Sequence, residues 1–276
     1  MPMIKVNDIN MYYEIHGEGQ PLVMIMGLSA NSSWWAEDII KKFSKYFKVI
    51  IFDNRGAGKT DSPEKPYSIK MFTDDTVALM NVLGIKKAHI FGVSMGGMIA
   101  QELVLNYPEK VDRLVLGCTN CGGSKQVLPS LEVMGKLANP PEDLTSEDII
   151  EDTIPLLYTQ KFIDENPEYI EDVKKIVFKT PITPDAFKRQ VGAILGFNSY
   201  RRLKNINVPT LIIHGKKDIM APPENAGVLA KQIPNAKVIL FDDAAHSFFQ
   251  PEPDRVINTI LEFLQASIDK QVETVI

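Results

Sequence analysis

Cysteine, histidine and long apolar runs are all scarce in this sequence, and basic residues do not exceed acidic ones. Lysine and arginine number 30 against 35 aspartates and glutamates, which gives a formal net charge of −5 and no basic footprint for nucleic acid. No run reaches the roughly 20 apolar residues of a membrane span, and the first residues lack the apolar stretch of a signal peptide. We therefore expect a cytoplasmic protein with no nucleic-acid partner and no membrane partner.

The two cysteines, Cys118 and Cys121, have the C-x-x-C spacing that also occurs in redox and zinc sites. A zinc site needs further ligands, and no histidine lies near them in the sequence. A thioredoxin-type motif needs a helix that starts at the first cysteine, and no helical pattern begins at Cys118. We expect both thiols to be reduced structural residues at the end of a strand, and we expect no metal site and no cofactor.

Apolar runs of strand length alternate with helical patterns over most of the chain, and 45% of its residues are hydrophobic. This alternation predicts an α/β fold, a mostly parallel eight-stranded sheet with helices on both faces. Core helices are expected at residues 34–45, 72–83, 225–232 and 256–264 and directly after residue 94. The strands are expected at residues 4–6, 11–15, 21–26, 49–52, 90–91, 111–117, 208–213 and 237–241.

The alternation stops after Asn120 and resumes near residue 206. Between these points the sequence shows only helical patterns separated by prolines, with no convincing strand. The helical patterns lie near residues 127–137, 146–158, 167–179 and 184–197. We therefore predict a core domain of residues 1–120 and 206–276, with a helical cap (lid) domain of residues 121–205 inserted after the sixth strand.

One serine lies where a strand gives way to a helix. Ser94 is flanked by Gly92 and Gly96 in the pattern G-x-S-x-G, with an apolar run before it and a helical pattern after it. This spacing is typical of a sharp turn that exposes a nucleophilic hydroxyl above the end of a sheet. The backbone N–H of Met95, in the first turn of the helix, would point to a developing oxyanion. Ser94 is therefore the candidate nucleophile, and Met95 a candidate oxyanion-hole donor.

A serine hydroxyl needs a base within hydrogen-bond reach and a group that orients that base. The four histidines are His16, His89, His214 and His246. The first precedes a turn before the core of the sheet, the second opens the strand that Ser94 ends and so lies at the wrong end of it, and the third is expected to pack or bond in the core. His246 follows the last strand, at the carboxyl edge where open α/β sheets place their sites, and Asp218 follows the strand before it. The sequence thus predicts a catalytic triad in the order Ser94, Asp218, His246.

Residues 53–60 imitate the end of a phosphate-binding loop. The first glycine of G-x-x-x-x-G-K-[ST] would have to stand at Asp53, so the spacing disfavours a nucleotide site. We expect instead a tight surface loop whose backbone is bonded by Asp53 and Arg55.

With these motifs in place, nearly the whole chain resembles the α/β-hydrolase superfamily, specifically the capped branch that contains small carboxylesterases and 3-oxoadipate enol-lactonases. The resemblance is carried by Gly92-Val93-Ser94-Met95-Gly96-Gly97, by Asp53-Asn54-Arg55-Gly56-Ala57-Gly58, by the segment from Val208-Pro209-Thr210 to His214-Gly215-Lys216-Lys217-Asp218, and by His246. It implies a second oxyanion donor in the loop after the third strand, which maps to the N–H of Leu28. Many relatives have His-Gly where this chain has Met26-Gly27. The amide donor survives that change, but methionine cannot make the hydrogen bonds that would orient the loop.

The triad and the resemblance together predict a cofactor-free serine hydrolase that cleaves a small carboxylic ester or lactone through an acyl-enzyme on Ser94. Trp34 and Trp35, which follow the Leu28 loop, are candidate substrate-binding residues. Carbon–carbon bond hydrolases, aminopeptidases and cofactor-free haloperoxidases or perhydrolases share the triad, and the fold also serves as a non-catalytic small-molecule receptor, so these alternatives stay open. Dehalogenases and epoxide hydrolases are disfavoured because they use an aspartate where Ser94 stands. The sequence also leaves the acyl group, the alcohol and the oligomeric state open.

Overall fold

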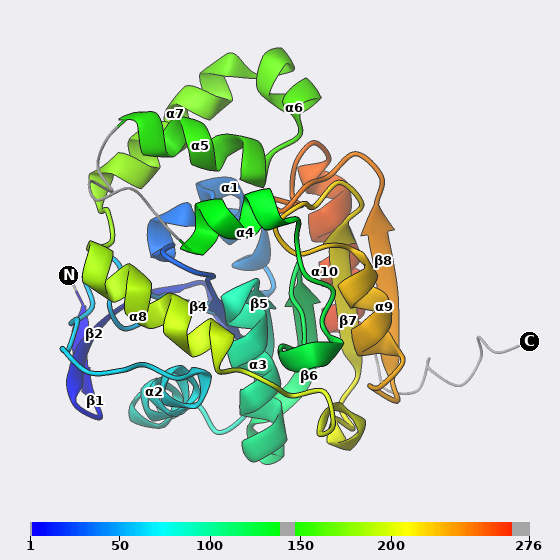
Figure 1. Ribbon diagram of the computed structural model, residues 1–276. Helices are drawn as coiled ribbons and strands as arrows, with labels where there is room; N and C mark the ends of the chain where they lie inside the picture. Colours follow the sequence, from blue (N-terminus) through cyan, green and yellow to red (C-terminus); the bar gives the residue numbers. More distant parts are fainter. Residues whose placement is uncertain (1, 139–146, 267–276) are drawn as a thin grey trace, which may run out of the picture.

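The computed structural model describes residues 2–138 and 147–266 of the protein. Its centre is an eight-stranded sheet in the order β1-β2-β4-β3-β5-β6-β7-β8 (Figure 1). The strands are β1 (Met3–Val6), β2 (Ile9–His16), β3 (Gln20–Ile25), β4 (Phe47–Phe52), β5 (Ala88–Val93), β6 (Val111–Gly117), β7 (Thr210–Gly215) and β8 (Ala236–Phe241). β2 runs antiparallel to both β1 and β4, and every pair from β4 to β8 is parallel. The predicted mostly parallel sheet of eight strands is confirmed.

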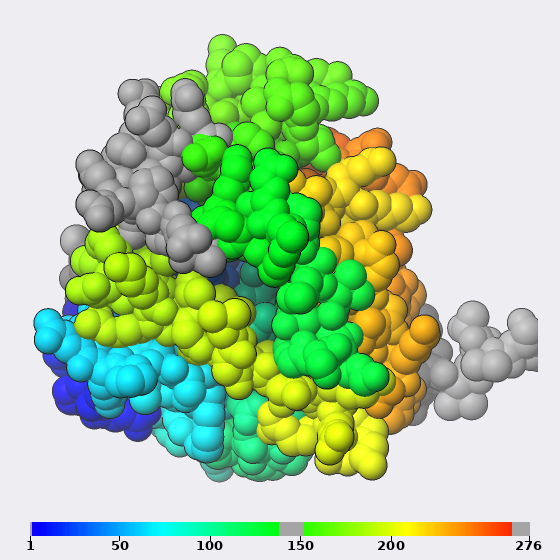
Figure 2. Space-filling view, in the orientation of Figure 1, coloured from blue at the N-terminus to red at the C-terminus, as the bar shows by residue number. Residues whose placement is uncertain are grey.

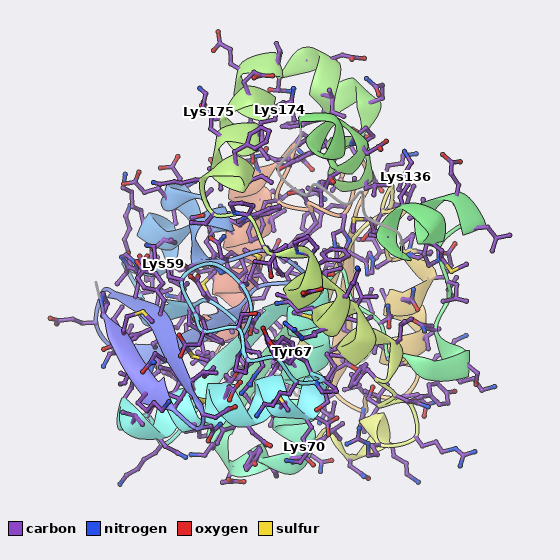
Figure 3. All side chains as sticks on the ribbon, turned by 60° about the vertical axis from the view of Figure 1, so that its left-hand side comes forward. Lys59, Tyr67, Lys70, Lys136, Lys174 and Lys175 are labelled. Carbon is purple, nitrogen blue, oxygen red and sulfur yellow. The ribbon has the colours of Figure 1, made fainter. Side chains whose placement is uncertain are left out.

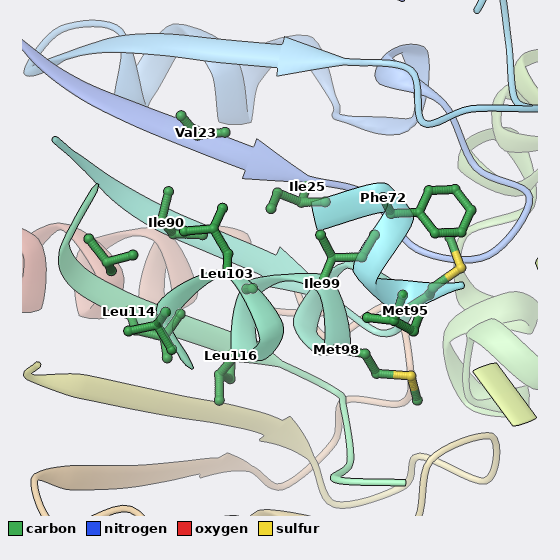
Figure 4. Close-up of a cluster of buried hydrophobic side chains, with 14 of the residues drawn as sticks. Val23, Ile25, Phe72, Ile90, Met95, Met98, Ile99, Leu103, Leu114 and Leu116 are labelled. Carbon is green, nitrogen blue, oxygen red and sulfur yellow. The ribbon is translucent and has the colours of Figure 1, made fainter. Parts of the chain in front are cut away.

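Helices cover both faces of the sheet. One face carries α2 (Ile69–Val82), α3 (Met95–Asn106) and α9 (Glu224–Ala230), and the other carries α1 (Glu37–Phe43) and α10 (Pro253–Gln265). Because successive side chains of a strand point to opposite faces, β3 contributes alternate residues to the two hydrophobic clusters. Figure 4 shows the first cluster, in which α2 and α3 pack on β3, β5 and β6. Burial on both faces explains why the central strands are continuous apolar runs.

Five α-helices occupy the described part of the segment between β6 and β7. They are α4 (Leu131–Ala138), α5 (Glu147–Leu157), α6 (Gln160–Glu165), α7 (Pro167–Lys179) and α8 (Pro184–Leu195). Figure 1 shows α5, α6 and α7 beyond the carboxyl ends of the parallel strands, where they share an apolar cluster built on Ile154, Tyr158, Phe162 and Ile170. Figure 3 shows Lys175 of α7 on the outside of the molecule. The helical insertion after the sixth strand is therefore as predicted.

Several element boundaries differ from the predicted ones. The helix predicted at 127–137 begins only at Leu131, because Val127 exchanges two 2.8 Å hydrogen bonds with the side chain of Asn225 and so stays outside the helix. The sequence does not predict α6. Residues 139–146, which include the expected start of the next helix at Ser146, lie outside the described residues.

The single helix predicted at 34–45 is two separate elements in the structure. Asn31 caps a short 3-10 turn, η1 (Ser32–Trp34), by accepting the Ser33 N–H at 3.0 Å, and α1 starts after it. Three further 3-10 turns are η2 (Pro108–Lys110), η3 (Gly123–Lys125) and η4 (Leu203–Asn205). Among the described residues, no helix combines the length and the apolar composition needed to cross a membrane.

The loop after β4 is buried, so its prediction as a surface loop is wrong. Asp53 does bond backbone, since its carboxylate accepts the N–H of Ser32 at 2.7 Å and that of Lys59 at 2.8 Å. Arg55 instead pairs its guanidinium with Asp75 at 2.7 Å and with Asp8 at 2.9 Å. These charge-assisted bonds compensate the loss of water around the guanidinium, which allows the loop to be buried.

Candidate active site

Ser94 occupies the tight turn between β5 and α3. Its backbone lies at φ 56° and ψ −120°, a conformation that costs a residue with a side chain on the order of 1–3 kcal/mol. The Ser94 N–H donates to the Gly117 carbonyl at 2.8 Å, and the Thr119 hydroxyl donates to the Ser94 carbonyl at 2.7 Å. A Cβ at Gly92 would overlap the carbonyl of Gly96, and a Cβ at Gly96 would overlap the carbonyl of Ile25, so this turn requires glycine at both positions.

His246 and Asp218 meet at the same edge of the sheet. β7 ends at Gly215 and β8 at its register partner Phe241, so the loops that follow these strands begin side by side. The Nδ1 atom of His246 lies 2.8 Å from Oδ2 of Asp218, and the two residues are only 7% and 3% exposed. A carboxylate can only accept, so Nδ1 donates and Nε2 of the neutral ring is left as an acceptor.

Four donors surround the carboxylate of Asp218. Its Oδ1 accepts the N–H groups of Met220 and Ala221, each at 2.9 Å, and its Oδ2 lies 3.2 Å from Nε2 of His214 in addition to its bond with His246. Burial alone would raise the pKa of Asp218. The charge that His246 can carry and the hydrogen bonds from the two histidines outweigh this and hold the pKa well below its usual value. The carboxylate is therefore ionised at neutral pH.

The backbone N–H groups of Leu28 and Met95 are available to an oxyanion. Within residues 2–138 and 147–266, neither group donates a hydrogen bond to another part of the protein. Met95 begins α3, where the first N–H groups have no acceptor within the helix. A Cβ built on Gly27 would lie 3.0 Å from Cβ and 3.5 Å from Oγ of Ser94. The loop that carries the Leu28 N–H therefore passes directly beside the serine.

Comparisons with known proteins identify the family of this chain. Residues 20–253 match the profile described as the alpha/beta hydrolase fold. The chain belongs to the α/β-hydrolase family. It is 30% identical over 273 residues to the putative carbamate hydrolase RutD of Azorhizobium caulinodans, covering 98% of this chain and 100% of that relative.

Solved structures agree. The enol-lactonase from Burkholderia xenovorans LB400 superposes with a TM-score of 0.85 at 25% identity, covering 96% of this chain and 100% of that one. A thermophilic esterase from Thermogutta terrifontis gives a TM-score of 0.83 at 25% identity, covering 96% and 98%. The predicted resemblance to the α/β-hydrolase superfamily is confirmed, and the comparisons support a hydrolase.

This α/β hydrolase places its two adjacent tryptophans in unlike surroundings. Trp35 is buried in the second hydrophobic cluster, with its ring centroid 5.4 Å from that of Phe91 and 6.5 Å from that of Phe249. Its Nε1 has no hydrogen-bond partner among the described residues. Trp34 is half-buried against the same cluster. The ring of Trp35 thus serves the core, and a substrate contact by either tryptophan stays a prediction.

The sequence does not predict a buried cluster of titratable side chains that includes Asp218. The sulfur of Cys118, a ring nitrogen of His214 and a carboxylate oxygen of Asp218 lie within 4.8 Å of one another. A histidine that is distant in the sequence is therefore close to Cys118 in the folded protein. Cys118 and Cys121 are buried free thiols, and Cys118 directly follows β6, as predicted. Burial first, and then the charge of Asp218, raise the pKa of the Cys118 thiol well above its usual value. In this cluster, Nε2 of His214 lies 3.2 Å from Oδ2 of Asp218 and so adds to the contacts that hold the carboxylate.

Proposed function

We propose that this α/β hydrolase cleaves a small carboxylic ester or lactone through an acyl-enzyme intermediate, with Ser94, His246 and Asp218 as its catalytic triad. The observation that supports the proposal is that three parts lie at the same edge of the sheet. They are the strained Ser94 turn, the buried His246–Asp218 pair, and the unused N–H groups of Leu28 and Met95. Acyl transfer requires these parts, a nucleophile, an oriented base and donors for an oxyanion.

In the first half of the reaction, His246 Nε2 takes the hydroxyl proton as Ser94 Oγ attacks the carbonyl carbon. The oxyanion that forms accepts hydrogen bonds from the N–H groups of Leu28 and Met95, while Asp218 stabilises the imidazolium. The imidazolium then protonates the leaving alcohol as the acyl carbon–oxygen bond breaks. In the second half, His246 takes a proton from water, the water oxygen attacks the acyl carbon, and Ser94 recovers its proton as the acid leaves.

Ester and lactone substrates are favoured by the similarity to an esterase and an enol-lactonase. Figure 2 shows the surface hollowed between α4 and α8, with atoms of the core visible at the floor. A carbamate is the second candidate, because the RutD relative is described as a putative carbamate hydrolase and a carbamate carbonyl accepts the same attack by a serine.

The test is a panel of p-nitrophenyl esters of increasing chain length, with a lactone, a carbamate and a peptide amide beside them. Turnover distinguishes an enzyme from a receptor, and the preferred acyl length measures the pocket. Ser94→Ala should lower turnover of the best ester by roughly 10⁴-fold while leaving the fold intact. A serine-directed phosphonate should label Ser94 alone. Retention of a tenth of the activity by Ser94→Ala would remove the serine from the mechanism.

A further inference from the structure

One buried side chain of the helical insertion, that of Gln190 in α8, anchors the part of the loop next to Leu28, while Asn31 at the end of the loop donates to the Thr180 hydroxyl of the insertion at 2.9 Å. Gln190 is 0% exposed. Its Oε1 accepts the backbone N–H of Ser29 at 2.9 Å, and its Nε2 donates to the backbone carbonyl of Arg55 at 3.1 Å. Ser29 has a φ of 61°, a left-handed conformation that is unfavourable for a residue with a side chain. The hydrogen bond from its N–H therefore helps to hold a conformation that the chain would not choose unaided.

The acceptor at the other end of Gln190 is itself immobilised. The guanidinium of Arg55 makes two bonds to Asp75, at 2.7 and 2.9 Å, and one to Asp8 at 2.9 Å. It also lies 5.6 Å from the ring centroid of Tyr67, which Figure 3 shows between α2 and α8. These contacts hold Arg55, and with it the carbonyl that accepts from Gln190, in place. Through its two hydrogen bonds, Gln190 therefore ties the Ser29 N–H to a rigid part of the core.

A second side-chain amide holds the loop on the opposite side of Leu28. Asn54, which is 1% exposed, donates from Nδ2 to the carbonyl of Met26 at 3.0 Å. Three peptide planes run in sequence from Met26 to Ser29. Asn54 fixes the first, Gln190 fixes the third, and the middle plane carries the N–H of Leu28. Because a peptide is planar, fixing its two neighbours restricts the direction of that N–H.

The side chain of Leu28 adds a packing contact with the same helix. It lies against the small cluster of Ile182, Ala186 and Phe187 at the beginning of α8. Both the polar and the apolar restraints on this loop thus come in part from residues 182–190 of the insertion, which lie more than 150 positions away along the chain.

We propose that Gln190 is a positioning residue that aims the Leu28 N–H at the oxyanion of the reaction. The inference rests on the proposed acyl transfer at Ser94. Removing one oxyanion donor outright costs serine hydrolases about 10²–10³-fold in kcat. Gln190→Met keeps the length and shape of the side chain and removes both hydrogen bonds while the donor itself stays in the backbone, so we expect a loss of about 10–100-fold in kcat with KM changed less than about threefold.

The matched control is Ser199→Ala. Ser199 is also fully buried and also joins the insertion to the core, through a 2.8 Å hydrogen bond from its hydroxyl to Oε1 of Gln101 in α3. It has no hydrogen bond to residues 26–31. If buried contacts of this kind matter only for folding, the two variants should show similar losses of stability in urea and similar small losses of kcat.

Affinity for a trifluoromethyl ketone separates a positioning role from a merely structural one, because the adduct of the ketone with Ser94 places an oxyanion beside the N–H groups of Leu28 and Met95. A merely structural role of Gln190 would leave this affinity unchanged. In Gln190→Met its affinity should fall by about the same factor as kcat, whereas in Ser199→Ala it should stay within about threefold of the parent. Normal kcat and normal ketone affinity in a folded Gln190→Met would overturn the positioning role of Gln190. The proposed function would stand in that case, because the parent enzyme would still turn over ester and Ser94→Ala would still lose activity. Absence of ester turnover in the parent would instead overturn the proposed function, and the inference with it.

Discussion

Asp218→Asn is the most informative single change in the candidate triad, because the two oxygens of the carboxylate have different partners. Oδ1 accepts from the backbone of Met220 and Ala221, whereas Oδ2 faces ring nitrogens of His246 and His214. An asparagine offers one accepting oxygen and one donating NH₂ group. Whichever way the amide turns, the NH₂ group meets two donors.

The amide oxygen is expected to face the backbone, since backbone N–H groups cannot change their protonation. His246 must then accept at Nδ1, so its proton moves to Nε2 and blocks removal of the Ser94 proton. We expect kcat to fall about 10⁴-fold, which is on the order of 5 kcal/mol of activation barrier. His214 cannot adapt in the same way, because its Nε2 also bonds the carbonyl of Ala221 at 2.6 Å. The remaining conflict should lower the free energy of unfolding by about 1–3 kcal/mol.

The assay is kcat for the best p-nitrophenyl ester, with urea unfolding followed in parallel. Asp242→Asn and Asp243→Asn are the matched controls, because these carboxylates lie on the same loop as His246 but are exposed, and Asp242 pairs with Lys216 at the surface. Each control should lose less than about tenfold in kcat, or about 1.4 kcal/mol. A larger loss in either control than in Asp218→Asn would place the orienting acid on the histidine loop and refute the assignment.

Two further predictions concern stability. Burial lowers the pKa of His89 to about 4, so the unfolded chain takes up this proton first and stability falls as the pH drops from about 6.5 to 4. His89→Phe keeps the edge contact with Phe47 and should flatten the pH dependence of the unfolding free energy over that range by about 3 kcal/mol, and an unchanged slope would contradict this. If residues 121–205 form a separate cap domain, hydrogen exchange should be faster at residues 147–205 than at Ile90 and Ile212 in the strands, and equal protection would argue against a separate unit.

The sheet and the positions of Ser94, Asp218 and His246 are readable from the sequence for one physical reason. Strands buried on both faces are continuous apolar runs, and in a parallel sheet their carboxyl ends share an edge. Polar residues that follow such runs therefore lie along one edge of the sheet, and those that follow neighbouring strands, such as Asp218 after β7 and His246 after β8, can come into contact whatever their distance along the chain. The same rule places the Leu28 loop, which follows β3, beside the turn after β5, because β3 and β5 are neighbours in the sheet.

Contacts between loops and the insertion follow no such rule. Nothing in the spacing of Gln190 and Ser29, or of Arg55 and Asp75, indicates that they touch, since each pair is brought together by the packing of whole elements. A buried arginine in particular is invisible to composition, because an isolated Arg55 reads as a surface residue until its carboxylate partners are known. The contact between His214 and Asp218 is easier to anticipate from the sequence. Only four positions separate the two residues, and β7 ends between them.

Met26 stands in the Leu28 loop where the resemblance to the family implies a histidine in many relatives, and this bears on how the loop is held. A histidine there could orient the loop with its own ring, whereas a methionine side chain offers no comparable hydrogen bond. The polar restraints on the loop instead include bonds from Asn54 in the neighbouring core loop, and from Gln190 and Thr180 in the insertion. Under the inference that Gln190 is a positioning residue, the insertion contributes to the orientation of the Leu28 N–H. Replacing it with the insertion of a relative would need to preserve an acceptor for the Ser29 N–H, or the new substrate range would come with a weaker oxyanion hole.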